Sequence, residues 1–523
     1  MDLFLTVNGQ VRGRRSASDV VAVLGIPYAA PPFGANRFKA PRPAPAWQGV
    51  RECVAFGPIS PQSAELPGAP TWSPGDEDVL NLNVWTDGNA AGRRPVLVWI
   101  HGGAYTFGSS AQPDFDGTAL VRAGLLVVTL NYRIGFEGFG HVPDPACPDN
   151  RGLLDQIAAL EWVRDNIAAF GGDPANVTVA GQSAGAASAA CLTVMERARG
   201  LFHRAIAHSV VGPVFSPRLA ADTTRLVADA AGVPATARGL TAASPYDLVH
   251  ASDQVVARLR EDPVAGARHY DPVLYGPVAD GDVLPADPLA VDAAARADVC
   301  LLVCHTTEEY WLMDAVGSSK KITTDDQLDA FARDFGLPDD LVPAYRALMP
   351  DAPVLDVFLA IHGDMSFAEY SSRLAERHAR AGRGTYLSRF ARRRVTESGV
   401  VHAWHCADVP FVFGTLDVPE LAFLIGGPPS AEDHELSRRM IRAWADFAAT
   451  GDPGWQPLDS AGEAETARAE TVRIWTTGAT GGGGPRGGGP RDGGTHDGGT
   501  HDGGTHDAYR AAWRAVDYAV VHP

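Results

Sequence analysis

VTVAGQSAGAAS, residues 177–188, is a short β-branched run followed by a G-x-S-x-G pattern centred on Ser183 and then by small helix formers. The five-residue pattern alone carries little weight, because glycine and serine are frequent in this chain. Its surroundings are more specific, since a strand before the serine and a helix after it form a tight turn that lifts the hydroxyl clear of a sheet. The stretch therefore predicts a strand, a nucleophilic Ser183 and a helix.

Further apolar runs elsewhere in the chain indicate the sheet to which this strand belongs. They cover residues 95–103, 124–133, 297–306 and 384–391, and each ends in glycine or a polar turn. Continuous β-rich runs without alternation are typical of strands buried on both faces of a parallel sheet. A helical pattern over residues 153–171 lies between two of them. We expect an α/β fold with a mostly parallel central sheet and helices on both faces.

A nucleophilic serine also needs donors for the oxyanion that forms when it attacks a carbonyl. The stretch HGGAYTFGSS, residues 101–110, follows directly from the strand expected at 95–100. A glycine pair there lets backbone N–H groups approach a substrate closely. We therefore predict an oxyanion hole made by Gly102, Gly103 and the N–H of Ala184.

Composition excludes several classes of function. The chain has 523 residues, 45% of them hydrophobic, and a formal net charge of −18, which disfavours a nucleic-acid partner. The first residues are too short and polar a stretch for a secretory signal, and no segment approaches the roughly 20 apolar residues of a membrane helix. We expect a cytoplasmic protein without a membrane partner. Lysine is rare among its basic residues, which points toward a bacterium. The patterns leave the oligomeric state open.

The C-terminal region differs in character from the rest. Residues 1–477 are expected to form the catalytic domain, 478–507 a glycine-rich flexible linker, and 508–523 a short helical segment docked through Tyr509 and Trp513. Three GGTHD repeats in the linker offer a weak metal-binding tract, but no ligand geometry is preorganised there. Its histidines are His496, His501 and His506.

Several stretches together resemble the type-B carboxylesterase family, the cholinesterase-like branch of the α/β-hydrolases, which includes bacterial esterases acting on p-nitrobenzyl esters. Beside the serine and glycine stretches above, they are GIPYAAPPFGANRFKAP (25–41), EDVLNLNVW (77–85), NYRIGFEGF (131–139) and FVFG (411–414). The similarity spans roughly residues 5–475 in family order. The resemblance implies an α/β-hydrolase fold and a serine carboxylesterase that acts on a small-molecule ester without metal or other cofactor.

The resemblance also implies a catalytic acid. In α/β-hydrolases the chain order is serine, acid, histidine, so the acid lies after Ser183. The family's glutamate falls on Glu309 in LLVCHTTEEYWLM, residues 301–313. Here Tyr310 replaces the glycine that follows it, and Glu308 is the alternative acid.

Two histidines in VVHAWHCADVPFVFG, residues 400–414, could be the base. The family's histidine precedes the first phenylalanine of FVFG by six positions, which selects His405, and His402 is then a pocket-lining or structural residue. A rival interpretation takes His402, His405 and Asp408 as metal ligands. It lacks the HExxH pattern and a third spaced ligand, so we expect no metal.

Other positions near these motifs are informative by comparison with the family. Gln182 stands where the family usually has glutamate, which favours neutral over cationic esters. Ser209 matches a serine that lies behind the catalytic residues in the family, although HSV here departs from the usual QSG. Aromatic residues are expected to line a hydrophobic pocket, and the candidates are Tyr105, Phe107, Trp311 and Trp404.

The cysteines indicate a reducing compartment. Secreted relatives carry a disulfide whose positions here are Ser60 and Val79, and the six cysteines of this chain lie elsewhere. We expect free thiols.

Three functions fit these patterns. The first is hydrolysis of carboxylic esters. The second passes the acyl group from Ser183 to another acceptor, as an acyltransferase or cyclase of secondary metabolism would. The third is a non-catalytic binding protein, which the presence of Ser183, Glu309 and His405 disfavours.

Overall fold

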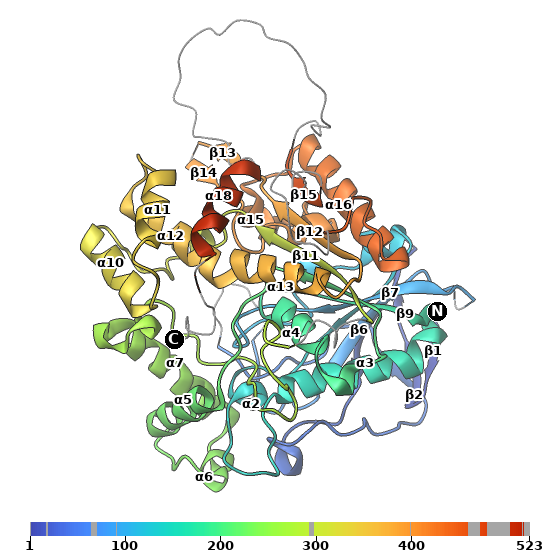
Figure 1. The fold of residues 1–523 in the computed structure, drawn as a ribbon. Coiled ribbons are helices and arrows are strands. Elements are labelled where there is room, and N and C mark those ends of the chain that lie inside the picture. Colours follow the sequence, from blue (N-terminus) through green and yellow to red (C-terminus); the bar gives the residue numbers. More distant parts are fainter. Residues whose placement is uncertain are drawn as a thin grey trace, which may run out of the picture.

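A computed structural model describes residues 2–16, 19–63, 71–89, 91–291, 298–397, 399–458, 471–477, 503–514 and 516. A large twisted sheet runs through the centre, and helices lie on both sides of it (Figure 1). Its strands are β3 (Arg14–Arg15), β4 (Val21–Pro27), β6 (Asn81–Thr86), β7 (Arg94–Ile100), β8 (Leu126–Leu130), β9 (Gly172–Gln182), β10 (Arg204–His208), β11 (Cys300–Thr306), β12 (Thr385–Phe390) and β15 (Val472–Trp475). Small separate sheets are formed by β1 (Leu3–Thr6), β2 (Gly9–Arg12) and β5 (Val50–Glu52), and by β13 (Arg394–Thr396) and β14 (Gly399–Val401).

The large sheet is mostly parallel, as the sequence predicted. Within the described residues its order is β15-β12-β11-β10-β9-β7-β8-β6-β4-β3. The strands from β15 to β8 pair in parallel, and β6, β4 and β3 add an antiparallel edge. Each predicted strand run contains or overlaps one of these strands. β9 ends at the centre of the sheet, directly before Ser183.

The two faces of the sheet carry separate hydrophobic cores. On β7, Val96 and Val98 belong to the core covered by α3 (Arg151–Asn166) and α4 (Ala184–Leu192). Leu97 and Trp99 belong to the core covered by α1 (Thr118–Arg122), α14 (Val409–Phe413) and α16 (Ala431–Thr450). This alternation follows from the two-residue period of a strand, and it explains why the strands are apolar at every position.

Helices fill both layers and the space above the sheet. They are α1 (Thr118–Arg122), α2 (Gly135–Phe139), α3 (Arg151–Asn166), α4 (Ala184–Leu192), α5 (Pro217–Ala230), α6 (Ala237–Ala242), α7 (Pro245–Glu261), α8 (Ala267–Tyr270), α9 (Trp311–Ala315), α10 (Asp325–Asp334), α11 (Leu341–Leu348), α12 (Val354–Gly363), α13 (Glu369–Ala379), α14 (Val409–Phe413), α15 (Ala422–Ile425), α16 (Ala431–Thr450) and α18 (Gly503–Trp513). A π-helical turn, Asp364–Ala368, joins α12 to α13. The helix predicted at 153–171 is α3 followed by a 3-10 turn, which ends at Gly171 with φ of +89°.

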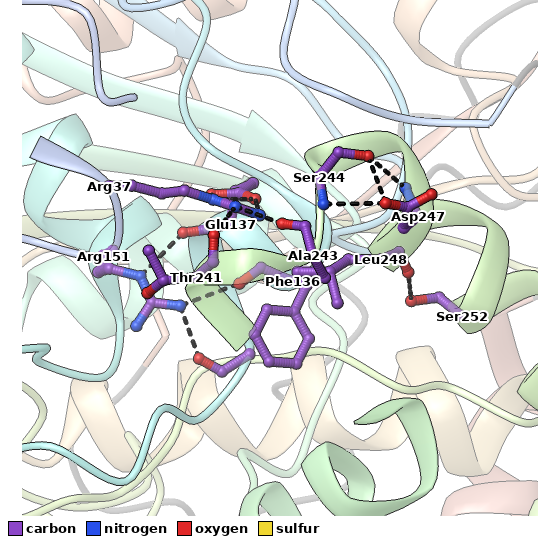
Figure 2. Close-up of polar contacts among 11 residues, drawn as sticks. Arg37, Phe136, Glu137, Arg151, Thr241, Ala243, Ser244, Asp247, Leu248 and Ser252 are labelled. Carbon is purple, nitrogen blue, oxygen red and sulfur yellow. Dashed lines mark hydrogen bonds and ion pairs between the residues drawn. The ribbon is translucent and has the colours of Figure 1, made fainter. Parts of the chain in front are cut away.

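A buried ion pair ties the N-terminal region to the helices beside the sheet. Figure 2 shows the guanidinium of Arg37 between the carboxylate of Glu137 on α2 and the carbonyls of Thr241 and Ala243, which lie at the end of α6 and just beyond it. Arg151, at the start of α3, donates to the backbone carbonyl of Glu137 at 2.8 Å. These charge-assisted bonds hold three chain segments that are far apart in sequence.

The C-terminal helix packs onto the domain. Trp513 of α18 is fully buried, and its Nε1–H donates to the hydroxyl of Tyr345 on α11 at 2.7 Å. Arg510 forms ion pairs with Glu369 and Glu376 of α13. The helix begins at Gly503, five residues earlier than predicted, because extending an existing helix costs less than starting one.

The rest of the predicted linker, with most of its predicted metal-binding tract, lies outside the residues that the structure describes. Residues 478–502, with His496 and His501, lie outside the described residues, and only the backbone of His506 is described. Every cysteine is a free thiol, as expected. In the parts of the chain that the structure describes, no helix has the length and apolar character to cross a membrane.

Candidate active site

Ser183 lies on the tight turn that the sequence predicted between a strand and a helix. It follows β9 and precedes α4, with φ of +56° and ψ of −122°, a strained backbone conformation for a residue with a side chain. Its N–H donates to the carbonyl of His208 at 2.9 Å. A Cβ atom on Gly185 would lie 2.0 Å from the carbonyl oxygen of Ile100, so only glycine fits beside the turn. The turn places Ser183 at the end of β9, where it is buried, with 7% of its surface exposed.

The structure brings Glu309 and His405 together. Oε2 of Glu309 accepts a hydrogen bond from Nδ1 of His405 at 2.6 Å. Oε1 of the same carboxylate accepts from the hydroxyl of Ser209 at 2.6 Å and from the N–H of Thr306 at 2.7 Å. These three hydrogen bonds hold the Glu309 carboxylate in place, and the bond to Nδ1 orients the imidazole of His405.

The alternative acid, Glu308, faces other partners. Its carboxylate pairs with Arg393, accepts from the N–H of Ala403 at 3.0 Å and bonds to His402. Burial alone would raise the pKa of Glu308, but His402 and Arg393 lower it to about 2. Glu308 and His402 thus form a structural cluster beside the site, and His405 does not contact Glu308.

No hydrogen bond joins Ser183, the predicted nucleophile, to His405, the predicted base. Among the described residues the Ser183 hydroxyl has no hydrogen-bond partner. Nε2 of His405, the atom that would take its proton, instead lies 2.9 Å from Nε2 of Gln182. Sequence reasoning placed Gln182 near the site and did not foresee this contact.

Free backbone amides lie close to the serine turn. A Cβ on Gly102 would be 3.1 Å from Cβ of Ser183, so the loop after β7 packs against the nucleophile turn. The N–H groups of Gly102, Gly103, Ala104 and Ala184 donate to no acceptor in the described part of the chain. Ala104 was not predicted. Its φ of +49°, after +109° at Gly103, could not be read from a residue type that normally avoids this region.

The metal-ligand interpretation finds no support in the geometry. His402 bonds to Glu308 and His405 to Glu309, while Asp408 accepts from Nδ1 of the buried His208 at 2.7 Å. Cys304 completes a cluster with His208 and Asp408.

The tautomer of His208 is fixed by Trp444. Its indole Nε1–H donates to Nε2 of His208 at 2.8 Å, so Nε2 is the acceptor and Nδ1 carries the hydrogen. A metal ligand needs an unprotonated ring nitrogen, and both nitrogens are occupied. This cluster instead links the strand end next to Ser183 to the chain after His405.

The predicted aromatic residues have different environments. Tyr105 is buried against Phe139 and its hydroxyl lies 3.3 Å from Oγ of Ser188, so it packs in the core. Trp404 is buried on Phe423, and the half-buried Trp311 stacks on His402.

Two rings lie closer to the predicted catalytic residues. Phe107 is partly exposed next to Gly103. Phe367, which sequence reasoning missed, lies on the π-helical turn with its ring centroid 4.2 Å from that of His405. No sequence signal marks a π-helical turn, so its apolar side chain read as ordinary core.

Two influences on the pKa of His405 oppose each other. Burial disfavours the imidazolium, but the neighbouring Cys406 and the Glu309 carboxylate outweigh it and raise the pKa of His405 above its usual value. An ionised Glu309 thus stabilises the cation that forms when His405 takes a proton.

Comparison with known proteins shows the family to which this chain belongs. A family model described as the carboxylesterase family matches residues 3–471. The para-nitrobenzyl esterase of Bacillus subtilis (strain 168) is 35% identical over an alignment of 464 residues that covers 87% of this chain and 91% of that protein. Liver carboxylesterase 1F of Rattus norvegicus is 31% identical over an alignment of 508 residues that covers 87% of this chain and 86% of that protein. The solved structure of a thermophilic PNB esterase superposes with a TM-score of 0.78 at 32% identity, covering 91% of this chain and 96% of the other.

The fold is therefore the α/β-hydrolase fold. The chain belongs to the carboxylesterase family, and it is a carboxylic ester hydrolase.

Proposed function

We propose that this protein hydrolyses neutral, hydrophobic carboxylic esters through an acyl intermediate on Ser183. His405 is the base, Glu309 is the carboxylate that orients it, and no metal or other cofactor takes part. The observation that carries the proposal is the 2.6 Å bond from Nδ1 of His405 to Glu309, beside a serine held on a strained turn. Such a pair makes Nε2 the basic atom of the imidazole.

The chemistry follows from these positions. His405 takes the hydroxyl proton of Ser183 while Oγ bonds to the ester carbonyl carbon, which gives a tetrahedral oxyanion. The C–O bond to the alcohol then breaks, and His405 returns the proton to the leaving oxygen. Water repeats the sequence on the acyl-serine and releases the acid.

The free amides supply the oxyanion hole in this proposal. The N–H groups of Gly102, Gly103, Ala104 and Ala184 have no competing acceptor among the described residues. Ala184 is also the first residue of α4, whose N-terminal end favours negative charge. Unpaired donors held by the backbone stabilise the oxyanion without reorganising.

The preference for neutral, hydrophobic esters rests on two features. Gln182 carries no charge beside His405, and the rings of Phe107 and Phe367 lie near Gly103 and His405. We expect 3,3-dimethylbutyl butyrate, the uncharged carbon analogue of butyrylcholine, to be hydrolysed with the higher kcat/KM. A clear preference for butyrylcholine would contradict this part of the proposal.

The experiment for the reaction itself is turnover of p-nitrophenyl acetate, butyrate and octanoate by the purified protein. Ser183→Ala and His405→Ala should each lose activity by about 10³-fold or more, and His250→Ala, on the exposed side of α7, serves as a control. Folded wild-type protein without turnover would refute hydrolysis of these esters. Product analysis with added alcohols separates hydrolysis from acyl transfer.

The compartment is also a proposal. The free thiols are consistent with a reducing, cytoplasmic environment. Measuring what fraction of the cysteine thiols is oxidised in cell extracts would test this proposal.

A further inference from the structure

Gln182 lies between the oxyanion loop and the imidazole of His405. Its side chain is 5% exposed, with Nε2 at 2.9 Å from Nε2 of His405. On its other side, Oε1 would be 2.7 Å from a Cβ atom placed on Gly102. The amide thus fills the space beside the atom that must accept the serine proton.

The direction of this hydrogen bond follows from its partners. Glu309, as a carboxylate, only accepts, so Nδ1 of His405 carries a hydrogen. The Nε2 of an amide only donates, so Nε2 of His405 presents its lone pair to Gln182. Both bonds are satisfied together only by a neutral imidazole protonated at Nδ1.

We propose that Gln182 is a positioning residue that holds His405 in this neutral, proton-accepting form and occupies its Nε2 until Ser183 replaces it. This inference rests on the proposed ester hydrolysis, for which His405 is the base. It assigns Gln182 a role in the reaction beyond the choice between neutral and cationic substrates.

The contact explains the missing Ser183–His405 bond. An imidazole nitrogen accepts one strong in-plane hydrogen bond, so the amide of Gln182 and the hydroxyl of Ser183 compete for the same lone pair. The amide must move away before the proton of Ser183 can transfer.

A glutamate at position 182 would act in the opposite direction. A carboxylate cannot donate to a neutral Nε2, but it accepts from the imidazolium and attracts its charge. The other ionisable groups that influence His405 are Glu309, Cys406 and Asp408, and none of them is altered by this substitution.

The experiment compares the pH dependence of kcat/KM for p-nitrophenyl butyrate between wild type and Gln182→Glu. We expect the acid limb of the variant to lie at higher pH by about 1 unit or more, as a carboxylate next to a histidine produces. Gln254→Glu is the matched control, because Gln254 makes the same amide contact to a histidine, His250, at 3.0 Å on exposed α7. An unshifted limb in Gln182→Glu would overturn the inference, whereas a purely structural role would change the rate without moving the limb.

A measurement without turnover keeps this test separate from that of the proposed function. In protein labelled with ¹⁵N-histidine, the Nε2 resonance of His405 is assigned by its loss in His405→Gln. We expect a titration of the Nε2 proton of His405 in wild type, with a higher titration midpoint for His405 in Gln182→Glu. Equal midpoints, or a lower midpoint in Gln182→Glu, would refute the role of Gln182 even if esters are hydrolysed. Absence of ester turnover would refute the proposed function and leave this titration informative.

Discussion

Replacing Glu309 by glutamine should abolish most activity because the structure dictates which way the new amide faces. Oε1 of Glu309 accepts from both the Ser209 hydroxyl and the Thr306 N–H, while Oε2 accepts from His405. A backbone N–H can only donate, so the carbonyl oxygen of glutamine must remain on the Thr306 side. Its NH₂ group then faces Nδ1 of His405.

This orientation reverses the tautomer of the base. Nδ1 of His405 must now accept from the amide, so the single ring hydrogen moves to Nε2, which can no longer take the proton of Ser183. Removing the carboxylate also removes the stabilisation of the imidazolium. The loss in kcat should be about 10³–10⁴-fold, equivalent to about 4–5.5 kcal/mol of transition-state stabilisation.

The assay is hydrolysis of p-nitrophenyl butyrate, with the concentration of folded protein checked by circular dichroism. Glu308→Gln is the matched control, because this neighbouring buried glutamate bonds to Arg393 and His402 and not to the base. Its kcat should remain within about tenfold of wild type while its stability falls. A Glu309→Gln variant within tenfold of wild type would show that the carboxylate does not set the tautomer.

Three predictions concern stability. Trp513→Ala should lower the free energy of unfolding by about 3–5 kcal/mol in urea melts, because it empties a buried site and removes a bond to Tyr345; an unchanged midpoint would show that α18 is not docked. Arg37→Met should cost about 3–5 kcal/mol by leaving the buried Glu137 unpaired, and adding Glu137→Met should recover part of this loss, which a double-mutant cycle measures. Burial raises the pKa of Asp114 from 3.8 to about 7, so its favourable contribution is complete below pH 4 and is lost as pH rises through 7. Asp114→Asn should therefore raise the free energy of unfolding by up to about 4 kcal/mol above pH 7 and change it little near pH 4. Urea melts at both pH values measure this, and an equal effect at the two pH values would disprove it.

Patterns local in sequence predicted the framework well. The β-branched runs around 96–100 and 177–182 became strands of a mostly parallel sheet, because their apolar residues at every position fit only a sheet covered on both faces. The position of Ser183 on a turn followed from the same logic, since small residues on each side are required wherever the backbone packs this closely.

Contacts between distant segments could not be predicted in the same way. Glu308 and Glu309 are adjacent and chemically identical, and only the fold turns one toward His405 and the other toward Arg393. The free N–H of Ala104 depends on a backbone conformation that alanine does not announce.

The sequence by itself determined the fold class, the strand and helix around Ser183, and the residue types from which a catalytic triad could be built, because short-range periodicity and backbone sterics specify these features. The tertiary structure decided which acid faces the base, which ring lies against it, and that Gln182 occupies Nε2 of His405. These outcomes depend on side-chain directions at the ends of β9 and β11 and in the loop before α14, and packing sets those directions only when the segments come together.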